Sequence, residues 1–116
     1  MNTAKKITVV RKEPGNLPEI AEIENTLETV QREVGGYIET VTIANDCVII
    51  CNEEGLINGE KFNVNFLGLQ FFGTILISGR EKDIFASLTP KILALFMKEL
   101  TECERRTQEG RINQNN

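Results

Sequence analysis

One short polar segment, CNEEGLINGEKFN from Cys51 to Asn63, concentrates side chains that could bind a ligand. Its asparagines can both donate and accept hydrogen bonds, which suits nucleobase edges and ribose hydroxyls. The alternative is a solvated connection in which Gly55 and Gly59 permit tight turns and the asparagines cap backbone groups. As ligand-binding residues the sequence predicts Asn52, Glu53, Asn58, Lys61, Asn63 and Arg80.

The sequence contains few residues suited to catalysis. The 116 residues include no histidine, which excludes Ser-His-Asp and Cys-His nucleophile pairs and the usual proton shuttle at neutral pH. Glu53 and Glu54 are adjacent, so in an extended segment they point in opposite directions and form no acid–base pair by themselves. A small enzyme that uses carboxylates alone is the remaining alternative. We expect no catalytic residues and a protein that is not an enzyme.

The three cysteines, Cys47, Cys51 and Cys103, are expected to be reduced thiols, because their number is odd and no secretion signal precedes them. Cysteine is among the most buried residue types, so Cys47 and Cys51 are expected to pack in the core. Metal binding would need more ligands nearby, and the sequence contains no GxxxxGK[ST] or GxGxxG phosphate-binding motif. We therefore expect no metal and no cofactor.

The charge balance is acidic, with a net charge of -4 and an isoelectric point of about 4.9. Binding to a phosphate backbone needs clustered lysine and arginine, so direct nucleic-acid binding is not expected. No apolar run approaches the roughly 18–20 residues of a membrane span, and the first residues do not form a secretory signal. These features predict a cytoplasmic protein without membrane contact.

The elements around the polar segment follow from local patterns. Strands are expected at residues 7–10 and, less clearly, at 17–24, on either side of a Pro14-Gly15 turn. A helix is expected from an Asn25 N-cap to a stop at Gly35. Residues 37–52 read as a β-hairpin that turns at 44–46, and its second strand is apolar on both faces, as in a central strand.

The C-terminal half predicts one more clear strand at residues 71–78, a charged turn at 80–83, and a second helix capped by Thr89 with Pro90 in its first turn. Residues 104–116 lack apolar periodicity and are expected to form a frayed polar tail behind a single domain of residues 1–103. The fold class is α+β, with a mostly antiparallel sheet of about five strands and two helices.

The second helix is apolar over an arc roughly twice the ~100° stripe that a surface helix needs. The helix could lie between the sheet and another element of its own chain. It could also pack on the sheet with one side and on a partner subunit with the other, which would make the protein a homo-oligomer. Under the second interpretation the interface residues are Leu93, Met97 and Leu100.

Three segments carry a resemblance to a known family: VGGYIETV, CVIICNEEGLINGEKFN, and FFGTILISG with SLT beyond it. The residues of these segments and their order along the chain resemble the domain-of-unknown-function family 3846, over about Ile7 to Leu88. One position departs from the pattern, because Val64 stands where the family is expected to have an arginine. The resemblance therefore carries no role to Val64.

The resemblance implies a small protein of phages and mobile elements of Firmicutes that acts in the host cell cytosol. Such proteins often counter host defences, and some sequester cyclic-nucleotide signals in pockets between subunits. The resemblance and the predicted site together give an expected function, which is non-enzymatic capture of a small nucleotide immune signal. The alternative is an anti-CRISPR-type inhibitor that covers a host defence protein.

Overall fold

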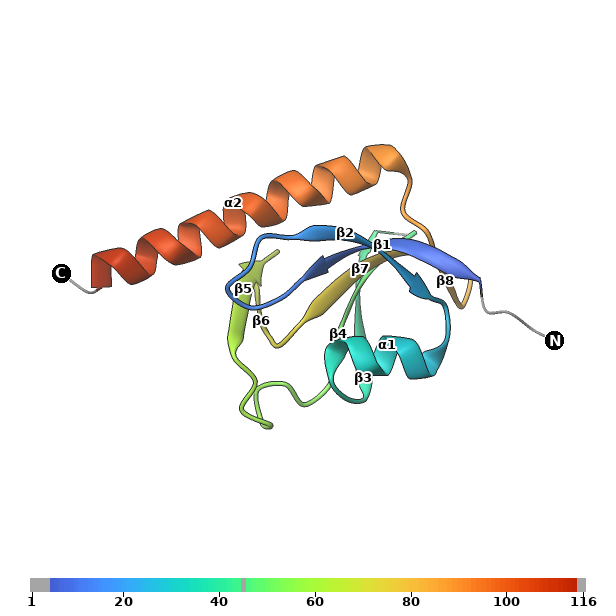
Figure 1. Cartoon of the computed structure of the whole chain (residues 1–116), viewed down its shortest axis with the longest axis horizontal. Coiled ribbons are helices and arrows are strands. Elements are labelled where there is room, and N and C mark those ends of the chain that lie inside the picture. The colour runs from blue at the N-terminus through green and yellow to red at the C-terminus, as the bar shows by residue number, and fades with distance from the viewer. Residues whose placement is uncertain (1–4, 45, 115–116) are drawn as a thin grey trace.

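The computed structural model describes residues 5–44 and 46–114, with side chains described as far as residue 110 (Figure 1). Within these residues the chain forms two helices and eight strands. In chain order they are β1 (Lys6–Lys12), β2 (Glu19–Glu24), α1 (Leu27–Val34), β3 (Ile38–Ala44), β4 (Cys47–Asn52), β5 (Phe62–Phe66), β6 (Leu69–Phe72), β7 (Ile75–Glu81), β8 (Ile84–Ala86) and α2 (Pro90–Gln114).

The strands form two antiparallel sheets. The large sheet has the order β2-β1-β7-β4-β3, with β8 paired to β7, and a separate hairpin consists of β5 and β6. This arrangement confirms the predicted α+β class. The hairpin predicted at residues 37–52 is present as β3 and β4, and of its turn Asn45 lies outside the described residues. The strand at 17–24 is also present, paired in register with β1.

Two hydrophobic cores lie on opposite faces of the large sheet. Figure 1 shows α2 over one face and α1 under the other. All six residues of β4 are buried, which confirms the prediction of a central strand covered on both sides. Ile49 and Cys51 join the core under α2, whereas Val48 and Ile50 join the core above α1. Because successive side chains of β4 point to opposite faces, this one strand contributes residues to both cores.

Helix α1 ends as predicted but begins one residue later than expected. Gly35 closes it in the left-handed conformation at φ 84°. Thr26 and not Asn25 is the N-cap, since Thr26 Oγ1 accepts a hydrogen bond from the Thr29 amide at 3.1 Å. Asn25 instead donates from Nδ2 to the Phe85 carbonyl at 2.8 Å. The capping prediction at Asn25 was wrong because a contact distant in sequence takes up that side chain.

The strand predicted at residues 71–78 is two strands. Gly73 separates β6 from β7 with φ 81°, a conformation that residues with a side chain rarely adopt. A hydrogen bond from the Gly73 amide to the Lys61 carbonyl, 2.7 Å long, fixes the position of this turn. The chain thus leaves the small hairpin and enters the centre of the large sheet.

Helix α2 begins at Pro90, where the Thr89 hydroxyl accepts from the Ile92 amide at 3.4 Å. It continues to Gln114, so residues 104–114 are helical where the sequence indicated a frayed tail. Figure 1 shows the last turns extending past the β5–β6 hairpin. The side chain of Glu104 explains part of this continuation, because it is buried and paired with Lys12.

The wide apolar arc of α2 is used mainly inside its own chain. Leu93, Phe96, Leu100 and Cys103 are buried in the core beneath the helix, and Met97 is partly buried against the same core. Leu93 and Leu100 are therefore corrected from predicted interface residues to core residues. Among the described side chains of this helix, Leu95 is the large apolar one that stays exposed, at 47%. In the described part of the chain, no helix combines the length and apolarity needed to cross a membrane.

Candidate functional site

Two of the predicted ligand-binding residues, Asn52 and Asn63, are buried and bonded to the protein itself. Asn52 Nδ2 donates to the Val34 carbonyl at 3.2 Å, and its Oδ1 accepts from the Glu54 amide at 2.8 Å. Asn52 thus joins the end of α1 to the start of the 53–61 loop. These contacts match the capping alternative in the sequence analysis.

Asn63 belongs to a buried polar cluster with Lys12 and Glu104. Lys12 Nζ donates to Asn63 Oδ1 at 2.9 Å and to Glu104 Oε1 at 2.8 Å. Asn63 Nδ2 donates to the carbonyls of Lys12 and Gly73. Among the described side chains, no buried polar atom lacks a hydrogen-bond partner. The cluster has no free group for a ligand and joins α2 to β1 and β5.

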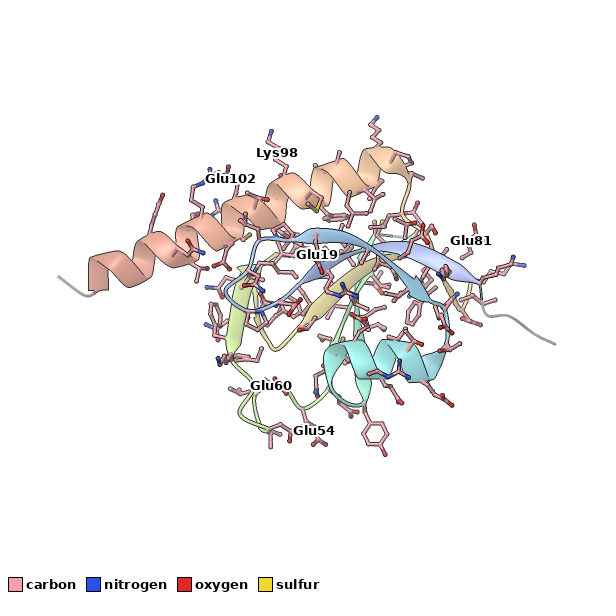
Figure 2. The ribbon with its side chains drawn as sticks, in the orientation of Figure 1. Glu19, Glu54, Glu60, Glu81, Lys98 and Glu102 are labelled. Carbon is pink, nitrogen blue, oxygen red and sulfur yellow. The ribbon has the colours of Figure 1, made fainter. Side chains whose placement is uncertain are left out.

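The other predicted residues are not gathered at one place. Glu53, Asn58 and Lys61 are exposed on the loop between β4 and β5. Arg80 lies near the other end of β4, because its neighbour Gly79 pairs with Cys47. Figure 2 shows the same separation, with Glu54 and Glu60 on the loop at lower left and Glu81 at the right. The structure therefore separates Arg80 from the predicted site.

A hollow of about 350 Å³ adjoins the predicted loop, and we call it the loop hollow. Asn52 and Glu53 border it from the predicted set. The rest of its wall comes from β3, β4, the loop and β6, and includes Glu39, Val41, Cys51, Leu56, Leu69 and Phe71. Exposed leucines at positions 56 and 69 make its rim apolar.

A second hollow of about 340 Å³, the helix hollow, lies farther along β3. Its wall is formed by the end of β3, the tip of the β5–β6 hairpin and the first turns of α2, and includes Ile43, Asp46, Phe66, Leu67, Leu95 and Glu99. Val41 borders the loop hollow and Ile43 borders the helix hollow, so the two hollows follow one another along the strand. We call them together the β3 groove.

The strand beside the groove, β3, is an edge strand of the large sheet. No strand pairs with β3 on its outer side among the described residues. The Glu53 amide donates to the Tyr37 carbonyl at 2.8 Å, which fixes the alternation of the antiparallel ladder. Consequently the backbone groups of Glu39 and Val41 face β4, whereas those of Ile38, Thr40 and Thr42 face outward.

In the described part of the chain, the charged residues that border the two hollows are all acidic. A guanidinium lies near the same strand outside these walls, because Arg80 Nη1 donates to Thr42 Oγ1 at 3.4 Å. Glu39 and Glu53 border the loop hollow, and Asp46 and Glu99 border the helix hollow. Neither wall contains a lysine or an arginine among the described residues. The groove therefore combines an apolar floor with four carboxylates, which favours a ligand that is apolar and positively charged.

The thiol of Cys51 lies in the wall of the loop hollow and is not set up for reaction. Burial raises the pKa of this thiol from its ordinary value of 9.0 to about 11, and the carboxylate of Glu39 adds to the rise. Since the thiolate is the reactive form, the folded protein keeps Cys51 inert at neutral pH. The described residues also include no group of three or more His, Cys, Asp or Glu placed to hold a metal ion.

This raised pKa predicts a pH dependence of stability. The unfolded thiol ionises near pH 9 and the folded thiol near pH 11, so the Cys51 contribution to stability is complete below pH 9 and is lost as the pH rises through about 11. In urea unfolding at pH 8 and pH 10.5, the wild type should lose more stability than Cys51→Ala. Equal losses in the two proteins would contradict this assignment.

Comparison with known families places the chain. The family model described as Domain of unknown function (DUF3846) matches residues 7–101. The chain belongs to this family. The resemblance noted in the sequence is thereby confirmed, and the DUF3846 match extends past Leu88 into α2. All residues that border the β3 groove, from Glu39 to Glu99, lie inside the matched span. No curated protein and no solved structure matches the chain.

Sequence reasoning found one side of this site and missed the others. It selected the loop that carries Glu53 but not β3, β6 or α2, which complete the groove. One feature of the sequence could have indicated the missing walls of the groove, namely large apolar residues that the core does not need. The structure leaves four of them exposed: Leu56, Leu67, Leu69 and Leu95.

Proposed function

We propose that this protein works by binding without turnover, and that the β3 groove receives a positively charged segment of a partner protein. The observation that supports this proposal is the pairing of two apolar hollows with Glu39, Glu53, Asp46 and Glu99. Apolar side chains of the partner would fill the hollows and supply affinity. The carboxylates would steer the encounter and select basic partners.

This version of the function is the protein–protein alternative from the sequence analysis, and the charge of the groove favours it over nucleotide capture at the same place. A nucleotide phosphate in the loop hollow would lie beside Glu39 and Glu53, and like charges repel. Moreover, the side-chain amides of Asn52 and Asn63 already donate hydrogen bonds to backbone carbonyls of the protein. The groove is also complete within one chain, so the proposal needs no second subunit.

The biological setting rests on the family resemblance alone. We propose that the protein is encoded by a phage or mobile element and acts in the host cell cytosol against a defence protein. Blocking such a protein would be stoichiometric, because no turnover is involved. A nanomolar dissociation constant corresponds to about -12 kcal/mol, which one groove with a few buried anchors can supply when the partner is well matched.

A pair of peptides tests the proposal directly. One is the acetylated, amidated peptide KTVTVTK, whose two valines and two lysines share one face of an extended strand, and its twin ETVTVTE differs only in the terminal charges. We expect the basic peptide to bind with a dissociation constant of about 100 µM or lower, and the acidic twin at least about tenfold more weakly, a difference of about 1.4 kcal/mol. Isothermal titration calorimetry at low salt measures both values.

Charge reversal at the groove provides the matched variant. Glu39→Lys with Glu53→Lys should reverse the preference, so that the acidic twin binds better. Glu22→Lys with Glu24→Lys makes the same change in net charge on β2, the opposite edge of the sheet, where both side chains are exposed. The control should keep the preference for the basic peptide. Equal effects of the two double variants would show that net charge and not the groove decides binding.

One observation supports nucleotide binding, and it concerns a hollow away from the predicted loop. A hollow of about 510 Å³ is bordered by Lys5, Lys6 and Lys82, with Glu81, Phe85 and Ser87 also in its wall. Its size is within the usual range for small-ligand pockets, and three lysines suit a phosphate group. Equilibrium dialysis with cyclic dinucleotides tests this second candidate. Binding that Lys82→Glu weakens would support it, and no uptake at 1 mM would remove it.

A further inference from the structure

The outer edge of β3 is an unused row of hydrogen-bonding groups. Outward-facing amides and carbonyls of Ile38, Thr40 and Thr42 have no partner strand in the described structure. Proteins usually block such an edge with lysine, proline, a bulge or a very short strand. β3 has seven residues, contains neither lysine nor proline, and has one irregularity near its end, between Thr42 and Ala44.

The side chains of β3 show which face an added strand would share. Glu39 and Val41 pair with Cys51 and Ile49, and these two partners belong to the core on the α2 side. Residues paired across a ladder project to the same face, so Glu39 and Val41 face the groove. A strand added next to β3 would place every second side chain on this face, at steps of about 6.6–6.8 Å.

The two hollows occur at the same interval along the strand. Val41 borders the loop hollow and Ile43, two residues later, borders the helix hollow. Alternate side chains of an added strand can therefore reach both hollows in succession. The carboxylates of Glu53 and Glu99 border the loop hollow and the helix hollow, where basic residues of the added strand would find opposite charges.

We propose that the partner docks by strand addition, in which an extended segment pairs with the outer edge of β3, fills the two hollows with alternate apolar side chains, and meets the acidic rim with lysine or arginine at its ends. This proposal rests on the function proposed above and specifies the partner segment and its mode of binding.

A second copy of this chain is a poorer occupant of the same edge. β3 itself contains one charged residue, Glu39, and no lysine or arginine. Pairing two β3 strands would bring the acidic rims of both grooves together, and the whole chain already has a net charge of -4. Charge complementarity therefore selects a basic partner over self-association.

Amide hydrogen exchange separates strand addition from other ways of filling the groove. In the free protein the Thr40 and Thr42 amides should exchange quickly, whereas those of Glu39 and Val41, bonded to β4, should exchange slowly. Saturation with KTVTVTK should slow exchange of the Thr40 and Thr42 amides by about tenfold or more, because strand pairing covers them. Binding that leaves their exchange unchanged would overturn strand addition while leaving the charged groove in place.

A proline substitution provides the matched genetic test. Thr40→Pro removes an outward amide and blocks the edge, yet it should keep the β4 hydrogen bonds, which the neighbouring residues make. Thr40→Val retains the amide and the size of the side chain. We expect at least about a tenfold weaker peptide affinity for Thr40→Pro and an unchanged affinity for Thr40→Val. Equal affinities of the two variants would refute strand addition.

A second probe keeps the result interpretable if Thr40→Pro does not fold. A KTVTVTK peptide methylated on all interior amide nitrogens has the same side chains and charge but cannot donate to a strand. The wild-type protein should bind it at least about tenfold more weakly than the parent peptide. Undiminished binding would overturn strand addition but preserve the proposed function. Absence of any preference for the basic peptide would overturn both. A dimer of the free protein that Thr40→Pro dissociates would assign the edge to a second copy and contradict the proposal.

Discussion

Replacing Glu104 with leucine should lower the free energy of unfolding by about 3–5 kcal/mol. Lys12 is 0% exposed and Glu104 1% exposed, and their charged groups lie 2.8 Å apart. Removing the carboxylate leaves the Lys12 ammonium buried, with only Asn63 and the Glu13 carbonyl as partners. Because a domain of this size has only about 5–15 kcal/mol of stability, this single change should threaten folding.

Two further variants test the cause of that loss. Glu102→Leu removes the exposed ion pair with Arg105 on the same helix and should cost less than about 1 kcal/mol. The double variant Lys12→Met with Glu104→Leu removes both charges and should recover part of the stability that Glu104→Leu loses. Urea unfolding of the four proteins measures these differences. A loss for Glu104→Leu no greater than that for Glu102→Leu would contradict the role of the buried pair.

Truncating Leu100 to alanine should destabilise the protein by about 2–5 kcal/mol, the usual cost of deleting a fully buried leucine side chain. Leu100 is 0% exposed and packs in the core between α2 and the sheet. Leu95→Ala is the matched control, since the same change at an exposed position of the same helix should cost about 0.5 kcal/mol or less.

The Leu100 variant also decides between the two interpretations of the apolar helix. If α2 packs on its own sheet, the loss should be the same at low and high protein concentration. If Leu100 instead lay between subunits, stability would depend on protein concentration and the variant would shift the assembly state. Thermal unfolding at 5 µM and 200 µM, with light scattering on the same samples, separates these results.

Much of the fold was predictable because its signals are local. An unbroken apolar run at Cys47–Cys51 specified a central strand, and Thr89-Pro90 specified the start of α2. Gly35 likewise marked the end of α1. Each of these features depends on the backbone preferences of a few consecutive residues, which a single sequence contains.

The features that escaped prediction depend on contacts between distant parts of the chain. Lys12 and Glu104 are 92 positions apart, so nothing near either residue indicates a buried pair. The same pair accounts for part of the continuation of α2 where the sequence suggested a tail. Asn63 looked like a ligand-binding residue because its partners are the carbonyls of Lys12 in β1 and of Gly73 in the turn between β6 and β7, outside its own strand.

The candidate site shows the same limit. Its loop was visible in the sequence, but the groove exists only where β3, β6 and α2 converge. The wide apolar arc of α2 suggested a partner subunit, and the core of the chain accounts for most of it. What the sequence could not indicate is that the exposed remainder, Leu95, borders an acidic groove beside a free strand edge.

The most direct test of the β3 groove is to map its residues by nuclear magnetic resonance while KTVTVTK is added to the isotope-labelled full chain. We predict that the largest amide shift changes fall on β3, on residues 53–56, on β6 and on the first turns of α2, and that the twin ETVTVTE produces much smaller changes. Changes that gather instead around Lys5 and Lys82, or that are equal for both peptides, would contradict the assignment of function to this groove.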